Sequence, residues 1–257
     1  MRGRTRHWTK TAVLTAAAIT TLGCLPEQVG QTPKNTLVIG LDVSGSFRQT
    51  GYHKDAIEFA SYYIYAHLHS LGELKQPSDL FVASVGGLRP GETKAFHPIH
   101  DFAAKTPQEI AASLREWFPI EDQLTDFNVF FVRVAELIKE RGLILQPLNI
   151  VILSDGIHDM TGRTSRRDES IYKKIDVSQL EYLSRNVTVR LLYAAPPVAE
   201  GWKRDIDRSR VRIWTVEQEV MEGWRAQYRR GQPMAAQDSL WKWVDDIVDF
   251  PARRGVL

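Results

Sequence analysis

The sequence has almost no cysteine: Cys24 is the only one among 257 residues. A single cysteine excludes any disulfide within the chain, so a hydrophobic core must hold the fold together. The composition supplies that core, since 43% of the residues are hydrophobic and 25% are charged. This balance is ordinary for a globular protein, and the length suits one sizeable core rather than clearly two.

The sequence also lacks basic character outside its first residues. Its formal net charge is +2, but residues 1–23 contain four basic side chains and no acidic one, namely Arg2, Arg4, Arg6 and Lys10. Without these four, 29 basic side chains face 31 acidic ones, which is a net charge of −2. Nucleic-acid binding needs a basic face on the folded part, so we expect no nucleic-acid partner.

The apolar run Thr11–Leu22 is too short to span a bilayer comfortably. It follows a positively charged stretch and leads through small residues to Cys24, which is the arrangement of a secretory signal. Thr21-Leu22-Gly23-Cys24 resembles the lipobox at which bacterial lipoproteins are cleaved and acylated, although Thr21 stands where leucine is usual. We expect residues 1–24 to be a signal peptide and Cys24 to be acylated, with a plain secretory signal as the alternative.

Residues 25–35 contain Pro26, Gly30 and Pro33 among polar residues, which predicts a short flexible tether. Residues 36–257 then form the folded domain. Several acyl chains on Cys24 would anchor the protein firmly in a membrane, whereas a single chain binds weakly. We therefore expect an exported, membrane-anchored lipoprotein on the periplasmic or extracellular side, with a soluble periplasmic or secreted protein as the alternative.

The domain alternates apolar runs with helical patterns, and it contains no repeat. The nearly continuous apolar runs 37–41 and 149–153 are typical of central strands buried on both faces. Weaker strand patterns cover 80–85, 187–193, 211–216 and a short edge strand near 94–97. Helical spacing covers 53–71, a helix from the capping box at Thr106 through Trp117, 128–140, 176–185 and an apolar stripe over 240–248. This alternation predicts an α/β fold with a doubly wound, mainly parallel six-stranded sheet flanked by helices.

Polar side chains follow the two central strands. Asp42-Val43-Ser44-Gly45-Ser46 comes after the first, Ser154-Asp155-Gly156 comes after the second, and Thr125 precedes a helix between them. Ligands bind at the carboxyl ends of parallel strands, where the strand order reverses. Two carboxylates and three hydroxyls form a hard oxygen ligand set that suits Mg²⁺ or Mn²⁺. We expect Gly45 to make a tight turn that brings Ser44 and Ser46 to one ion.

This order of motifs resembles the metal-ion-dependent adhesion site of von Willebrand factor A (vWA) domains, and the resemblance extends over Thr36–Phe250. Integrin inserted domains and many bacterial surface and envelope proteins share this family. The resemblance implies that Ser44 and Ser46 coordinate the metal directly, and that Thr125 does so when ligand is bound. Asp42 and Asp155 hold the metal directly or through water, and an acidic side chain of a protein partner takes the sixth position.

The sequence departs from the family before Thr125, because Gln123-Leu124 stand where many members have Gly-Gly. Thr93 and Thr106 are rival candidates, but Thr106 is better explained as a helix cap. We expect His158 to be exposed to solvent beside the site, with a contact to a partner as the alternative. We expect the pairs His67-x-His69 and His97-x-x-His100 to be structural. The basic stretch Arg163–Lys174 is either a rim that steers acidic partners or a solvated loop.

The favoured function is a metal-dependent protein-binding module of the cell envelope, acting in adhesion or assembly. One alternative is a metal-assisted hydrolase, since Asp42 follows a first strand as the nucleophile does in haloacid dehalogenase-like phosphatases. That chemistry needs a second Asp two residues later, but position 44 is a serine. The sequence also has no nucleophile elbow and no phosphate-binding loop. We expect no catalytic residues. The other alternative is a scaffold that binds no metal.

Overall fold

The computed structural model describes residues 34–86, 95–119, 125–158 and 169–249, all within the compact unit Pro33–Leu257. The predicted signal peptide, Cys24 and most of the predicted tether lie outside the described residues. Within the described part, no helix has the length and apolar character needed to cross a membrane.

The described residues build a six-stranded sheet in the order β3-β2-β1-β4-β5-β6. Five strands run parallel, and the short edge strand β3 pairs antiparallel with β2. The strands are β1 (Thr36–Asp42), β2 (Asp79–Val85), β3 (His97–Pro98), β4 (Leu148–Leu153), β5 (Val187–Ala194) and β6 (Arg212–Glu217). The predicted α/β class with a six-stranded, mainly parallel sheet is confirmed.

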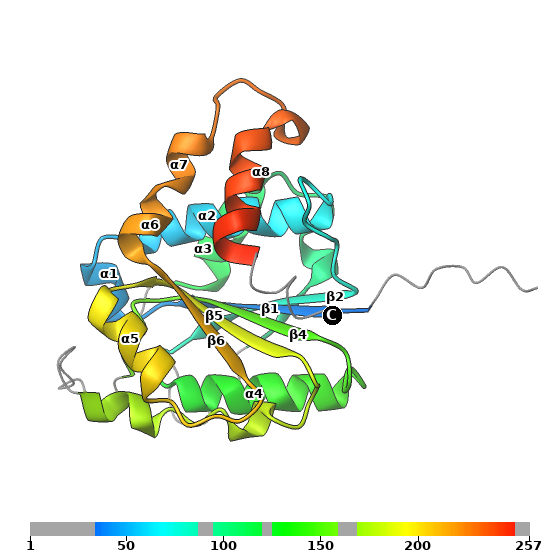
Figure 1. Cartoon of the computed structure of the whole chain (residues 1–257). Helices are drawn as coiled ribbons and strands as arrows, with labels where there is room; N and C mark the ends of the chain where they lie inside the picture. The colour runs from blue at the N-terminus through cyan, green and yellow to red at the C-terminus, as the bar shows by residue number, and fades with distance from the viewer. Residues whose placement is uncertain (1–33, 87–94, 120–124, 159–168, 250–257) are drawn as a thin grey trace, which may run out of the picture. The chain divides into compact units, whose positions relative to one another are not determined.

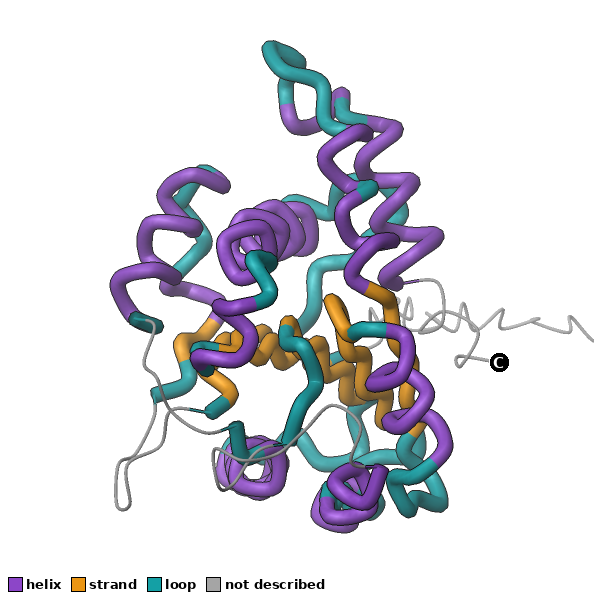
Figure 2. The backbone as a smooth tube through the Cα atoms, turned by 90° about the vertical axis from the view of Figure 1, so that its left-hand side faces the viewer, coloured by secondary structure: helices purple, strands orange, loops and turns teal. Residues whose placement is uncertain are grey.

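Helices cover both faces of this sheet, because the strands send alternate apolar side chains into two separate cores (Figures 1 and 2). One core lies between the sheet and α4 (Phe127–Glu140) with α5 (Pro196–Arg204). The other core holds α2, α3, α6, α7 and α8, which are His53–Leu68, Pro107–Trp117, Gln218–Glu222, Trp224–Gln227 and Asp238–Val244. The short helix α1 (Gly45–Gln49) follows β1 at the carboxyl edge of the sheet.

The predicted helix over 176–185 is wrong. Within that stretch the structure has a single 3-10 turn, Ser178–Leu180. The Asp176 carboxylate accepts a hydrogen bond from the Ser178 N–H at 2.8 Å, as a helix cap does, but no longer helix follows it. The Leu183 carbonyl accepts from the Leu145 N–H instead of an N–H further along its own segment.

Two other boundaries differ from the sequence patterns. Helix α2 ends at Leu68 rather than near residue 71, and Ser70 then takes a left-handed conformation with φ +50°. Helices α5, α6 and α7 had no clear pattern, because each is short and its contacts lie far away in sequence. The apolar stripe near the end of the chain is buried as expected, at Leu240, Trp241, Val244 and Val248.

Candidate metal site

The candidate site lies where the strand order reverses, between β1 and β4. These two strands are parallel and in register, with Leu41 opposite Leu153, so the residues that follow them leave the same edge of the sheet. The Ser154 hydroxyl donates a hydrogen bond to the Asp42 carboxylate across this gap. The first and third motifs therefore meet, as the sequence predicts.

The first loop is ordered around the Asp42 carboxylate. Its Oδ1 accepts from the Ser44 N–H at 2.8 Å, and Ser44 in turn caps α1 by accepting from the Phe47 N–H at 3.3 Å. The Ser44 and Ser46 hydroxyl oxygens lie 3.1 Å apart. Gly45 is not the tight turn that we expected: it opens α1 and is absent from the positive-φ glycines, so the start of the helix brings the two serines together.

The loop after β4 is held just as firmly. The Ser154 hydroxyl accepts from the Gly156 N–H at 2.9 Å, and Asp155 Oδ1 accepts from the Ile157 N–H at 3.1 Å. Gly156 has φ +76°, and a Cβ there would lie 2.6 Å from Leu191 Cδ2. Only glycine fits this position without strain, which explains the third residue of the Ser-Asp-Gly motif.

Ser154 is a positioning residue that sequence reasoning did not select. Its hydroxyl is fully buried and connects the Asp42 carboxylate to the backbone of the second loop. In the sequence, a serine between a strand and Asp-Gly indicates only an ordinary turn residue. The only available signal was its position directly before Asp155.

Burial, with a further contribution from the nearby Asp155 carboxylate, raises the pKa of Asp42 to about 7. Hydrogen bonds from Ser154 and Ser44 act in the opposite direction and favour the charged form. Two carboxylates are thus held close together in a buried place where their charges repel each other. A cation bound between them would offset both the burial and the repulsion.

Thr125 stands directly before α4, which begins at this same edge. Asp126 caps the helix by accepting from the Asn128 and Val129 N–H groups at 2.9 and 3.2 Å. The Phe127 ring lies 6.1 Å from the His158 ring and so fixes the start of α4 against the second loop. Thr125 is only 1% exposed, and its hydroxyl has no hydrogen-bond partner among the residues that the structure describes.

A buried hydroxyl without a partner is unusual in a folded protein and calls for an explanation. A metal ion would provide the missing interaction for Thr125. Asp42, Ser44 and Ser46 come from one loop, Asp155 comes from the next, and Thr125 comes from the start of α4. The described residues contain no group of three or more His, Cys, Asp or Glu side chains suited to a metal. The two carboxylates and three hydroxyls fit a hard divalent cation, which takes oxygen ligands of this kind.

The structure also tests several predictions about residues near the site. His158 is buried, at 4% exposure, so its predicted exposure is wrong; its ring packs on Phe127 inside the core. Thr106 is a helix cap as expected, with its hydroxyl accepting from the Glu109 N–H at 3.3 Å. Thr93, Gln123-Leu124 and the basic stretch up to residue 168 lie outside the described residues.

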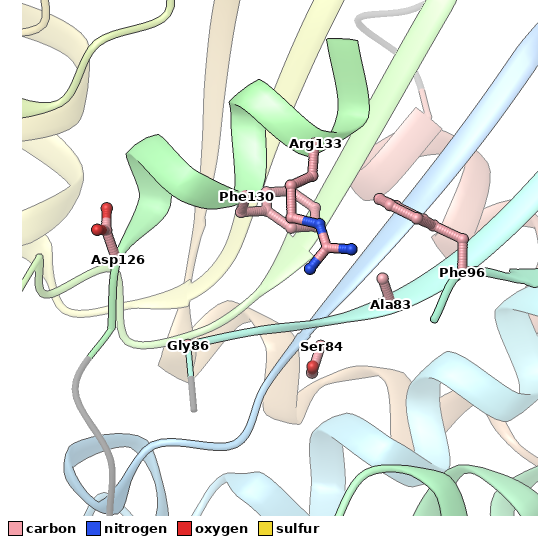
Figure 3. Close-up of a pocket in the computed structure, with 7 residues that line it drawn as sticks. All are labelled: Ala83, Ser84, Gly86, Phe96, Asp126, Phe130 and Arg133. Atoms are coloured by element: carbon pink, nitrogen blue, oxygen red, sulfur yellow. The ribbon is translucent and has the colours of Figure 1, made fainter. Parts of the chain in front are cut away.

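A small cavity lies between β2 and the first turns of α4 (Figure 3). Ser84, Phe96, Asp126, Phe130 and Arg133 are among the residues that line it. It has space for about one water molecule, which is far too little for a metabolite. The candidate binding site at this edge is therefore formed by the loops after β1 and β4 and not by this cavity.

No protein-family model and no curated protein matches the chain. Similar solved structures include the SpRpn10 VWA domain, with 11% identity over 79% of this chain and 93% of that chain, and a TM-score of 0.44. Manganese-loaded Plasmodium vivax TRAP protein has 13% identity over 73% and 70% of the two chains, and a TM-score of 0.40.

A third similar structure is proximal thread matrix protein 1 from the mussel byssus with a zinc-occupied MIDAS motif. It shares 12% identity over 83% of this chain, with a TM-score of 0.44, and this chain spans about half (48%) of its length. With TM-scores below 0.5, these similarities do not place the chain in a family. Its function has to be inferred from the residues of the site themselves.

Proposed function

We propose that the domain is a vWA-like binding module that holds a divalent cation, Mg²⁺ or Mn²⁺, and uses it to bind an acidic group of a protein partner. Asp42, Ser44, Ser46, Thr125 and Asp155 are the proposed ligands. The observation that carries this proposal is the meeting of three separate segments at one edge, with two repelling buried carboxylates and the partnerless hydroxyl of Thr125.

Hydrogen bonds already orient four of the five proposed ligands. The Ser44 N–H and the Ser154 hydroxyl hold Asp42, the Ile157 N–H holds Asp155, and the start of α1 presents Ser46 beside Ser44. The bound ion supplies a positive charge that attracts a carboxylate of the partner. The two carboxylates among the five ligands balance the charge of a divalent ion without exceeding it, so the site does not repel a further carboxylate.

The test compares two identical substitutions, Thr125→Val and Thr36→Val. Both threonines are 1% exposed and have hydroxyls without a hydrogen-bond partner in the described part of the chain, but Thr36 begins β1 at the opposite edge of the sheet. Valine keeps the shape of threonine, so neither variant should lose stability in chelator. We expect millimolar Mg²⁺ to raise the melting temperature of the wild type and of Thr36→Val, because it binds the folded state. Thr125→Val should show a much smaller rise.

An equal Mg²⁺ response in both variants would remove Thr125 from the site. The absence of any shift in the wild type with either Mg²⁺ or Mn²⁺ would favour a scaffold that works without metal. The binding role is tested by capturing envelope proteins on the immobilised protein. A genuine partner is retained with Mg²⁺ by the wild type and Thr36→Val, is released by chelator, and is not retained by Thr125→Val.

We further propose that the protein is exported and anchored in a membrane through acylated Cys24, and that it catalyses no reaction. Replacing Cys24 with alanine should move the full chain from the membrane fraction to the soluble fraction of a bacterial host. A wild type found in the soluble fraction would favour the plain secretory signal, and a variant that stays in the membrane fraction would remove Cys24 from the anchor. Turnover of phosphoesters that disappears in Asp42→Asn would overturn the absence of catalysis and support the hydrolase.

A further inference from the structure

Three large apolar side chains gather at the amino edge of the sheet, opposite the metal site. Ile144, Leu145 and Tyr182 are 44%, 78% and 81% exposed, and the last two are the most exposed large hydrophobic residues among those described. They come from two loops that the Leu145 N–H joins by a 2.7 Å hydrogen bond to the Leu183 carbonyl. Single exposed apolar residues are ordinary, but a cluster of them marks a contact surface.

The backbone conformation of Leu145 is unfavourable as well. Its backbone has φ +77°, in the left-handed region that glycine tolerates and leucine does not. The strained backbone and the exposed leucine side chain each lower the stability of the folded domain. Such outliers motivate a search for a function at the residue concerned.

The position of these residues indicates what they contact. The Thr36 N–H donates to the Pro147 carbonyl at 2.9 Å, so the chain enters β1 within a few residues of Leu145. Only ten residues lie between Cys24 and Asn35. Even fully extended, a stretch of that length spans no more than about 40 Å. A membrane that holds Cys24 is therefore within reach of this edge of the domain.

One basic side chain packs on the apolar ones, and two others are exposed nearby in the sequence. The Arg210 guanidinium lies 5.7 Å from the centre of the Tyr182 ring, and Arg141 and Arg185 are exposed on the same two loops or beside them. The loop that carries Arg210 is fixed next to Tyr182, since Glu181 accepts hydrogen bonds from the Ser209 and Arg210 N–H groups. Leucine, tyrosine and arginine together are the residue types that settle at a membrane interface with anionic lipids.

We propose that this amino-edge patch, defined as Ile144, Leu145, Tyr182 and Arg210, rests on the anionic headgroup region of the bilayer in which Cys24 is anchored. The patch holds the domain on the membrane with β1, β4 and β5 pointing outward, so the metal site at their carboxyl ends faces away from the lipid (Figure 1). This inference rests on the proposed anchor and is independent of the proposed metal.

The test places the photo-crosslinking residue benzoylphenylalanine in the full chain at position 145, 182 or 220 and irradiates the host membranes. Val220 is the matched control, because it is apolar and 43% exposed but lies on α6, which follows the carboxyl end of β6. We expect phospholipid adducts, identified by mass, from positions 145 and 182 at about ten times the yield from 220. Burying one leucine in lipid corresponds to at least that preference.

A second variant separates lipid contact from folding. Leu145→Gly suits φ +77° and removes the apolar side chain, so it should fold normally yet lower the lipid adducts formed from position 182. A membrane-bound chain that gives no lipid adducts at 145 and 182 overturns this inference and leaves the anchor standing. Adducts of twice the chain mass would assign the patch to a second copy, and adducts to another protein would assign it to a partner. A full chain found only in the soluble fraction overturns the anchor and the patch together.

Discussion

The sharpest consequence of the site concerns the buried charge of Asp42 when no metal is present. Asp42→Asn keeps the size of the side chain and an oxygen for the Ser44 N–H, but it carries no charge. Because burial and Asp155 raise the pKa of Asp42 from 3.8 to about 7, the folded wild type keeps a proton that the unfolded chain releases. In chelator, the wild type should therefore lose stability as the pH rises from about 4 to 7.

The size of this loss follows from the pKa difference. The shift from 3.8 to about 7 corresponds to a free energy on the order of 4 kcal/mol, which is fully expressed above pH 7. Asp42→Asn should match the wild type near pH 4 and exceed it at pH 8. For a domain of this size, the gain corresponds to a rise in melting temperature of about 10 °C.

Urea unfolding in chelator from pH 4 to 8, with and without the substitution, measures this difference directly. Adding Mg²⁺ at pH 8 should then remove most of this difference, since the ion stabilises the wild type by about 2.7 kcal/mol at a hundred times its dissociation constant and does nothing for Asp42→Asn. A difference between the two proteins that does not change with pH would refute the electrostatic argument. A variant less stable than the wild type at pH 8 in chelator would refute it too.

Two further outcomes are expected. Ser154→Ala removes the hydroxyl that holds the Asp42 carboxylate and the Gly156 N–H. Urea unfolding should show a free energy of unfolding lower by about 2 kcal/mol, and calorimetry should show weaker Mg²⁺ binding. Unchanged values in both measurements would show that Ser154 does not position the site. Leu145→Gly should raise the free energy of unfolding by about 1 kcal/mol, because glycine relieves the strain at φ +77°; a loss of stability in the same assay would mean that the leucine side chain supports the fold.

The proposed ligands at the strand ends were predictable because their placement depends on a rule of topology. Continuous apolar runs before Asp42 and before Ser154 indicate buried parallel strands, and parallel strands deliver the residues after them to one edge. The strong local signals also held, such as the capping box at Thr106. After Asp176 the expected helix did not form, although its cap bond is present, and the Leu183 carbonyl pairs with the distant Leu145 N–H instead.

The residues themselves determined the α/β class and the two loops that meet at the carboxyl edge, because hydrophobic periodicity and strand-end motifs are local properties of the chain. Only the tertiary structure decided that Ser154 holds Asp42, that His158 is buried and that Thr125 has a hydroxyl without a partner. It also brought Leu145 and Tyr182 together at the opposite edge. These features depend on contacts between segments far apart in sequence, and burial and pairing of that kind exist only after the chain has folded.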